Sequence, residues 1–108
     1  MSTHVLDLAS GMPAPGVGIA LFRMADGGAP ELVSDLQTDD DGRIGDLLDG
    51  SNLTEGDYQL AFDIGAYDQD PEAFFQSVAL AIRITDVSRS YHVPLLLSPF
   101  GMSLYRGS

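Results

Sequence analysis

Hydrophobic and polar residues alternate with a period of two along most of the chain, a pattern typical of β-strands with one buried face. The clearest example is 56–64, where Tyr58, Leu60, Phe62 and Ile64 share one face. The same reasoning predicts strands at 3–8, 16–24, 31–38, 78–85 and 90–97, a return strand from 102 onward, and at most a short strand within 45–55. Turn clusters rich in Gly, Pro and Asp separate these segments.

Seven or eight short strands at regular spacing favour an all-β fold, an antiparallel Greek-key β-sandwich. One short helix is expected at 70–75, because Asp70 can cap it, Pro71 suits the first helical position and Glu72 the first turn. The length of 108 residues fits a single domain over residues 1–108.

Both histidines of the chain fall on strand faces of mixed polarity. Alternation places His4 with Leu6 and Leu8, and His92 with Pro94 and Leu96. Pro94 removes a ladder hydrogen bond, which predicts an edge or a bulge there.

The turn at 98–101 predicts a hairpin whose return strand carries further polar chemistry. In a simple register Ser103, Tyr105 and Gly107 share the surface of His92, whereas Arg106 falls on the opposite face. A face carrying His4, Leu6, Leu96 and Tyr105 is too apolar for bulk water, which indicates a subunit interface.

Charge and composition exclude several classes of function. The net charge is −11, all five basic residues are Arg, and Cys is absent. Such a surface repels nucleic acid and anionic membranes, and without Cys there is no thiol nucleophile or thiolate metal site. No apolar run approaches a membrane span, and the start lacks the features of a signal peptide, so a cytoplasmic location is expected.

The Asp39-Asp40-Asp41-Gly42 run is the strongest turn signal, and it is interpreted as a solvated turn that projects Arg43. It is not a calcium loop, because the twelfth residue counted from Asp39 is Gly50 where a bidentate Glu is needed. Two histidines without a third His or Cys also argue against zinc, although an Asp could serve as the third ligand. No metal site is predicted.

Four segments carry specific motifs: 2–7 (STHVLD), 38–43 (TDDDGR), 91–99 (YHVPLLLSP) and 105–108 (YRGS). Together and in this order they resemble the 5-hydroxyisourate hydrolases, the transthyretin-like proteins of purine breakdown. Two positions depart from the family pattern: Ser90, where members often have His, and Met102, where they often have an aromatic residue.

The resemblance implies a transthyretin-like sandwich that forms a homotetramer with active sites in a channel between dimers, and no cofactor. It implies hydrolysis of 5-hydroxyisourate at a cyclic amide to 2-oxo-4-hydroxy-4-carboxy-5-ureidoimidazoline in urate degradation. By motif, the catalytic positions fall on His4, Arg43, His92 and Ser108. Tyr105, Arg106 and Gly107 complete the terminal tetrapeptide and, with Leu96 on the mixed face, are expected to bind substrate.

The hypothesised mechanism is general-base hydrolysis, in which a neutral imidazole takes a proton from water and Arg43 holds the developing negative charge. His92 is the first choice of base and His4 positions water or substrate, although the roles can be exchanged. The rival mechanism is a covalent acyl-enzyme through Ser108. Two other functions remain open, a non-enzymatic carrier of the transthyretin type using the same channel and a plain structural sandwich.

Overall fold

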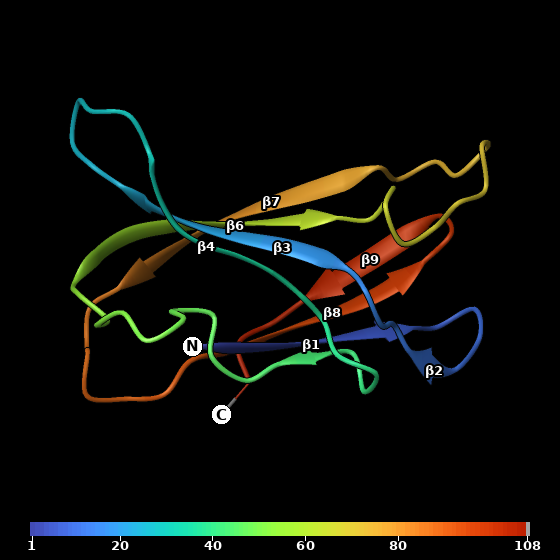
Figure 1. Cartoon of the computed structure of the whole chain (residues 1–108), viewed down its shortest axis with the longest axis horizontal. Coiled ribbons are helices and arrows are strands. Elements are labelled where there is room, and N and C mark those ends of the chain that lie inside the picture. Colours follow the sequence, from blue (N-terminus) through green and yellow to red (C-terminus); the bar gives the residue numbers. More distant parts are fainter. Residues whose placement is uncertain (108) are drawn as a thin grey trace.

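The structure, a computed structural model, describes residues 1–107 as two β-sheets packed face to face (Figure 1). The predicted β-sandwich is confirmed. Its strands are β1 (Ser2–Asp7), β2 (Met12–Pro13), β3 (Gly18–Met24), β4 (Glu31–Gln37), β5 (Arg43–Ile44), β6 (Gly56–Asp63), β7 (Ser77–Ile84), β8 (His92–Ser98) and β9 (Gly101–Leu104).

The two sheets differ in how their strands run. One sheet has the order β4-β3-β6-β7, and all its pairings are antiparallel. The other has the order β2-β1-β8-β9, with β5 also paired to β1. Here β1 and β8 run parallel, which corrects the expectation of a purely antiparallel sandwich. Parallel partners need a long crossover, and the whole opposite sheet supplies it.

The core lies between the sheets and is built from the faces that the alternation assigned inward. Val5, Leu60, Phe62 and Leu95 are completely buried. Thr3 is buried among them, and its hydroxyl donates to the carbonyl of Val93 at 2.6 Å. Because its hydroxyl is hydrogen-bonded, burying Thr3 costs little free energy. Thr3 and Val5 thus form the inner face of β1, and the residues that alternate with them point outward.

Residues 1–107 contain no helix, so the helix expected at 70–75 is wrong. The capping signal itself is real: Glu72 N–H donates to the Asp70 carboxylate at 2.9 Å, and Ala73 N–H to the Asp70 carbonyl at 3.0 Å. One turn forms and stops, because starting a helix fixes several residues for each hydrogen bond gained and six residues are too few to recover that cost.

Two short strands, β2 and β5, were expected as turns. Leu6 pairs with Pro13, and His4 with Arg43, on the same side of β1. Arg43 therefore does not project from a turn tip but begins a strand beside His4. A strand of two residues forms because of the strands beside it more than because of its own sequence. It is also too short to show an alternating pattern, so the sequence did not identify β2 and β5.

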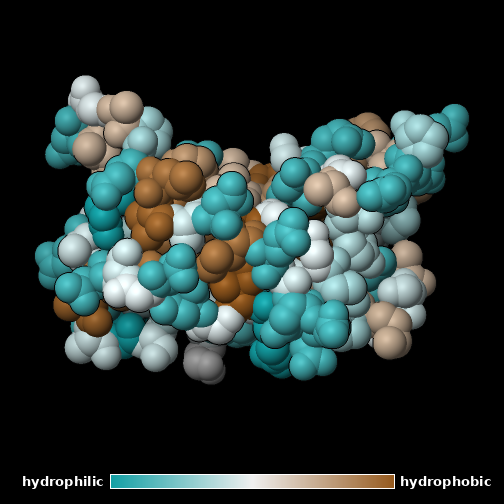
Figure 2. Space-filling view, in the orientation of Figure 1, coloured by the Kyte–Doolittle hydropathy of each residue, from teal (hydrophilic) through white to brown (hydrophobic). Residues whose placement is uncertain are grey.

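The turn between β4 and β5 is acidic and exposed at Asp39, Asp40 and Asp41. Figure 2 shows hydrophilic residues over much of one face of the molecule, with hydrophobic residues gathered toward its centre and left. Within residues 1–107, no helix is long and apolar enough to cross a membrane.

Candidate active site

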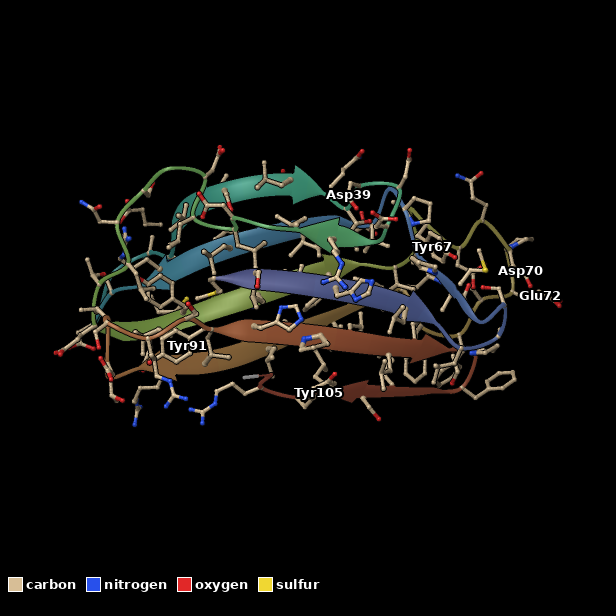
Figure 3. The ribbon with its side chains drawn as sticks, turned by 90° about the horizontal axis from the view of Figure 1, so that it is seen from below. Asp39, Tyr67, Asp70, Glu72, Tyr91 and Tyr105 are labelled. Carbon is tan, nitrogen blue, oxygen red and sulfur yellow. The ribbon has the colours of Figure 1, made fainter. Side chains whose placement is uncertain are left out.

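Three neighbouring strands, β5, β1 and β8, bring the predicted polar residues onto the outer face of their sheet. His4 lies opposite Arg43 on β5 and opposite Pro94 on β8. His92 is level with Ser2 on β1. Thr3 and Val5 point into the core, so His4 points outward. Figure 3 looks onto this side, with Asp39 and Tyr105 on opposite sides of the β1–β8 pair.

The aspartate-rich turn holds Arg43 in place through its first residue. One carboxylate oxygen of Asp39 accepts from the backbone N–H of Asp41 at 2.9 Å and of Arg43 at 3.0 Å. Gly42 follows with φ of 75°, a left-handed conformation that favours glycine. Its carbonyl accepts from Val5 N–H at 2.8 Å. The turn is thus tied to β1 and sets the start of β5 beside His4.

The same turn orients His4. Its Nε2 lies 2.8 Å from the backbone carbonyl oxygen of Asp41. A carbonyl only accepts, so Nε2 carries the proton. A neutral His4 is therefore the tautomer with its lone pair on Nδ1.

His92 is partly buried, and its surroundings shift its pKa. Its pKa is lowered from 6.5, first by burial and then by the positive charges of Arg43 and His4; a backbone hydrogen bond with Ser2 partly offsets this. A lowered pKa keeps the ring neutral at pH 7 and ready to accept a proton. Its Nδ1 lies 2.8 Å from the Ser2 hydroxyl.

Gly107 packs directly against His92 from the opposite side. The two residues form an isolated antiparallel bridge, in which Gly107 N–H donates to the His92 carbonyl at 2.7 Å. A Cβ on Gly107 would lie 2.8 Å from Cδ2 of the His92 ring. The tetrapeptide therefore needs glycine here because the imidazole occupies the space of any side chain.

We expect Gly107→Ala to displace the His92 ring and lower the turnover number by about tenfold or more, since small misplacements of a catalytic group are costly. Stability should change little, because Gly107 is only partly buried and has no positive φ. Steady-state kinetics and urea unfolding test this. Gly18→Ala, on β3 of the other sheet, is the matched control, since a Cβ there would make only an ordinary contact, 3.5 Å from Cβ of Asp63. Full activity in the Gly107 variant would contradict the expectation.

The site opens into a surface hollow of about 430 Å³. Arg43, His92 and Ser2 line it together with Thr3, Ile44, Gly45, Ser90 and Tyr91. Leu96 lies on the same face as His92, between Leu6 of β1 and Ser103 of β9. The structure thus brings His4, Arg43, His92, Leu96 and Gly107 to one sheet surface.

Tyr105 and Arg106 are placed differently. They line a mostly apolar hollow of about 240 Å³ between β7 and β9, with Leu80, Ile82, Val93 and Leu104 among its other walls. Neither residue lines the hollow that Arg43 and His92 share. Ser108, the fourth predicted catalytic residue, lies outside the described residues.

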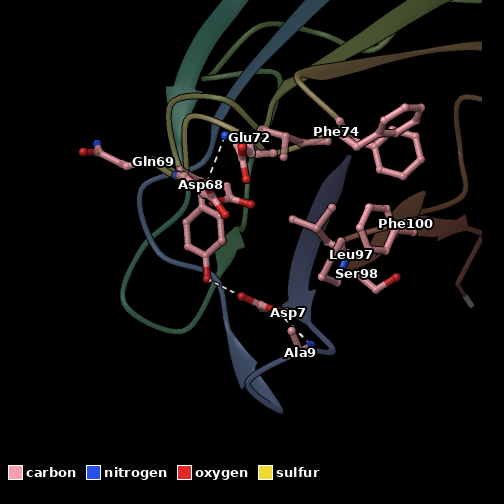
Figure 4. A pocket seen from close by; sticks show the side chains of 15 residues that line it. Asp7, Ala9, Asp68, Gln69, Glu72, Phe74, Leu97, Ser98 and Phe100 are labelled. Atoms are coloured by element: carbon pink, nitrogen blue, oxygen red, sulfur yellow. Dashed lines mark hydrogen bonds between the residues drawn. The ribbon is translucent and has the colours of Figure 1, made fainter.

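A third hollow, of about 390 Å³, sits at one end of the sandwich. Figure 4 shows Asp7, Asp68 and Glu72 on one side of it and Phe74 and Phe100 on the other. Burial and a 2.8 Å hydrogen bond to Asp7 raise the pKa of Tyr67 to about 12. The carboxylates that line this hollow repel anions. The hollow shares no lining residue with the one at His92.

Metal ligands do not gather anywhere in residues 1–107: no group of three or more His, Asp or Glu side chains could hold an ion there. Sequence reasoning missed three contributors to the site: the hydroxyl of Ser2, the carboxylate of Asp39 and the backbone carbonyl of Asp41. Ser2 precedes His4 by two residues and so shares its face, which is a usable signal. Nothing in the sequence showed that β8 would lie beside it.

The fold and site define a class: a two-sheet β-sandwich of the transthyretin type, with imidazole and guanidinium groups on the outer face of one sheet. A model of the HIUase/Transthyretin family matches residues 1–107. "5-hydroxyisourate hydrolase 2" of Rhizobium meliloti (strain 1021) is 45% identical, over 100% of this chain and 95% of the relative. The chain belongs to the HIUase/transthyretin family.

Solved structures agree with this assignment. The Klebsiella pneumoniae 5-hydroxyisourate hydrolase matches with a TM-score of 0.82 and 33% identity, over 99% of this chain and 97% of that one. Sea bream transthyretin in complex with thyroxine matches with a TM-score of 0.88 and 26% identity, over 98% and 92%. The fold is therefore common to an enzyme and a binding protein, and the site has to distinguish them.

Proposed function

We propose that this protein hydrolyses 5-hydroxyisourate, opening its ring at a cyclic amide. The observation that carries the proposal is the placement of His4, Arg43 and His92 on three adjacent strands of one sheet face. Attack of water on a carbonyl requires a base and a positive charge near the developing oxyanion. His92, whose pKa is lowered, can act as the base, and Arg43 can supply the charge. The near full-length similarity to relatives named for this activity supports the same substrate.

In the proposed mechanism neutral His92 takes a proton from water, and the water oxygen attacks the ring carbonyl. Arg43, exposed at the edge of the hollow, stabilises the negative charge that develops on the carbonyl oxygen. His4 holds water or substrate. The imidazolium of His92 then returns its proton to the leaving nitrogen, so the ring opens without a covalent intermediate.

The tetrapeptide has a supporting part in this proposal. Gly107 leaves room for the His92 ring, and Leu96 forms an apolar part of the substrate surface. Tyr105, Arg106 and Ser108 are proposed to contact substrate or to brace this segment. Intact-mass analysis after rapid mixing with substrate tests the rival role of Ser108, since an adduct on the C-terminal peptide is expected only for an acyl-enzyme.

The proposed assembly is a homotetramer, a dimer of dimers with the sites in a channel between dimers. β7 and β9 are edge strands of the two sheets and flank one apolar hollow, and unpaired edges of this kind favour pairing with another copy. Analytical ultracentrifugation measures the assembly state. A cytoplasmic location and a single domain over residues 1–108 stay predictions from the sequence.

A carrier function is the second candidate, because sea bream transthyretin shares the fold and binds thyroxine in its crystal structure. A carrier channel has no need of a base beside an arginine, so the arrangement of His4, Arg43 and His92 favours hydrolysis. The test is direct: urate is treated with urate oxidase, the protein is added, and the ultraviolet absorbance of the transient intermediate is followed. Decay faster than the spontaneous rate supports the hydrolase, and an unchanged rate refutes it.

The lowered pKa of His92 predicts the pH dependence. A base is active when unprotonated, so kcat/KM should fall on the acid side with an apparent pKa below the ordinary value of 6.5. Arg43→Gln removes a charge that disfavours the imidazolium, so its residual activity should show that acid limb at higher pH. A pH–rate profile of both proteins checks this, and an acid limb that does not move would mean that another group titrates.

A further inference from the structure

The hydroxyl of Ser2 is the contact of the His92 ring that the proposed mechanism leaves without a role. Oγ lies 2.8 Å from Nδ1, in a partly buried position. The contact joins residues 90 positions apart in sequence and follows from the parallel pairing of β1 with β8, which sets Ser2 level with His92. Backbone bonds hold this register, since Ser2 N–H donates to the Tyr91 carbonyl at 2.9 Å.

We propose that Ser2 is a positioning residue that accepts the Nδ1–H of His92 and thereby fixes the tautomer whose lone pair lies on Nε2. The proposal rests on the proposed hydrolase function for its kinetic consequence, but not for the tautomer itself. The hydrogen bond made by one ring nitrogen decides which nitrogen carries the proton. In this tautomer Nε2, the nitrogen farther from the backbone, is the basic one.

A further contact fixes the place of the ring. On its other side His92 is bounded by Gly107, whose absent side chain leaves the ring its place. The ring is thus set by Ser2 along its polar edge and by Gly107 along its carbon edge.

His4 is held in the complementary way. Its Nε2–H donates to the Asp41 carbonyl, so its lone pair lies on Nδ1. With Ser2 accepting as proposed, the two imidazoles hold opposite tautomers, and only His92 presents Nε2 as a base. This difference supports His92 as the proton acceptor and His4 as a positioning group.

Ring-nitrogen NMR tests the tautomer without any activity. The chain has only two histidines, so a variant lacking one assigns the other. Above the pKa of His92 we expect a protonated Nδ1 and an unprotonated Nε2 in the wild-type protein and in Ser2→Thr, which keeps the hydroxyl. In Ser2→Ala the ring should become a mixture of tautomers. A wild-type His92 with its proton on Nε2 would overturn the proposal.

Kinetics supplies the second arm. Ser2→Ala should lower kcat by about tenfold with little change in KM, the size of effect seen when the partner of a functional histidine is removed. Ser2→Thr should restore most of it. Ser51→Ala, in an exposed loop between β5 and β6, controls for loss of a serine hydroxyl. An Ala variant with wild-type kcat refutes the positioning role, whereas a wild-type protein without activity refutes the hydrolase and leaves the NMR result to decide on Ser2.

Discussion

His92→Asn is expected to lower the turnover number for 5-hydroxyisourate by about a hundredfold or more, the usual contribution of a general base. Asn retains a polar group of similar reach but has no basic nitrogen. His92 is only partly exposed and lies between Ser2 and Gly107, so the smaller side chain should leave the sheet intact. Stopped-flow measurement of intermediate decay gives kcat, and far-UV circular dichroism reports the fold.

His4→Asn is the matched comparison, because it changes the other imidazole on the same face. If His4 positions water or substrate, its loss should raise KM or lower kcat by less than the loss of His92. Unchanged turnover in the His92 variant would remove that residue from the mechanism. A larger loss at His4 would exchange the two roles, with His4 acting through Nδ1.

Gly42→Ala is expected to cause the largest loss of stability, about 3 kcal/mol from left-handed strain and overpacking together. A Cβ there would lie 2.5 Å from the Val5 carbonyl oxygen and 3.0 Å from the Ala14 nitrogen. Both are backbone atoms, so neither can turn aside. Relief requires moving the β4–β5 turn away from β1, which also displaces Arg43 and the carbonyl that binds His4.

Urea unfolding measures this effect, and Gly11→Ala separates its two causes. Gly11 has φ of 72°, close to that of Gly42, but no atom lies within 4 Å of a Cβ there. Its substitution should cost only the conformational part, about 1 kcal/mol. Equal losses at the two positions would show that the close approach to Val5 contributes nothing.

Alternation along the sequence predicted the faces of the strands well. Val5 and Leu95 are buried, while His4, Leu6, His92 and Leu96 lie outward, as expected. The hairpin register held too, since Leu96 pairs with Ser103 and His92 with Gly107. Pro94 falls between these pairings, where the β8–β9 ladder is interrupted. The expected edge or bulge is wrong, because β8 has a partner strand on both sides and its register with β9 is the same before and after Pro94.

The sequence said less about which strands lie next to each other. Alternation gives a strand its faces but not its neighbour or direction, so the parallel β1–β8 pair was missed, and with it the contact between Ser2 and His92. The carbonyl of Asp41 belongs to the backbone and leaves no residue signature. The helix at 70–75 failed for the opposite reason, because its local signal was correct but too short to propagate.

The β1–β8 pairing also bears on how the molecule folds. It joins positions 90 residues apart, so it closes a very large loop, and contacts of such high order form late and slowly. His92 lacks its Ser2 partner until that loop is closed, whereas His4 and its partner Asp41 are only 37 residues apart. Recovery of catalysis during refolding should therefore coincide with completion of the native sheet, and a half-formed sandwich should be inert towards substrate.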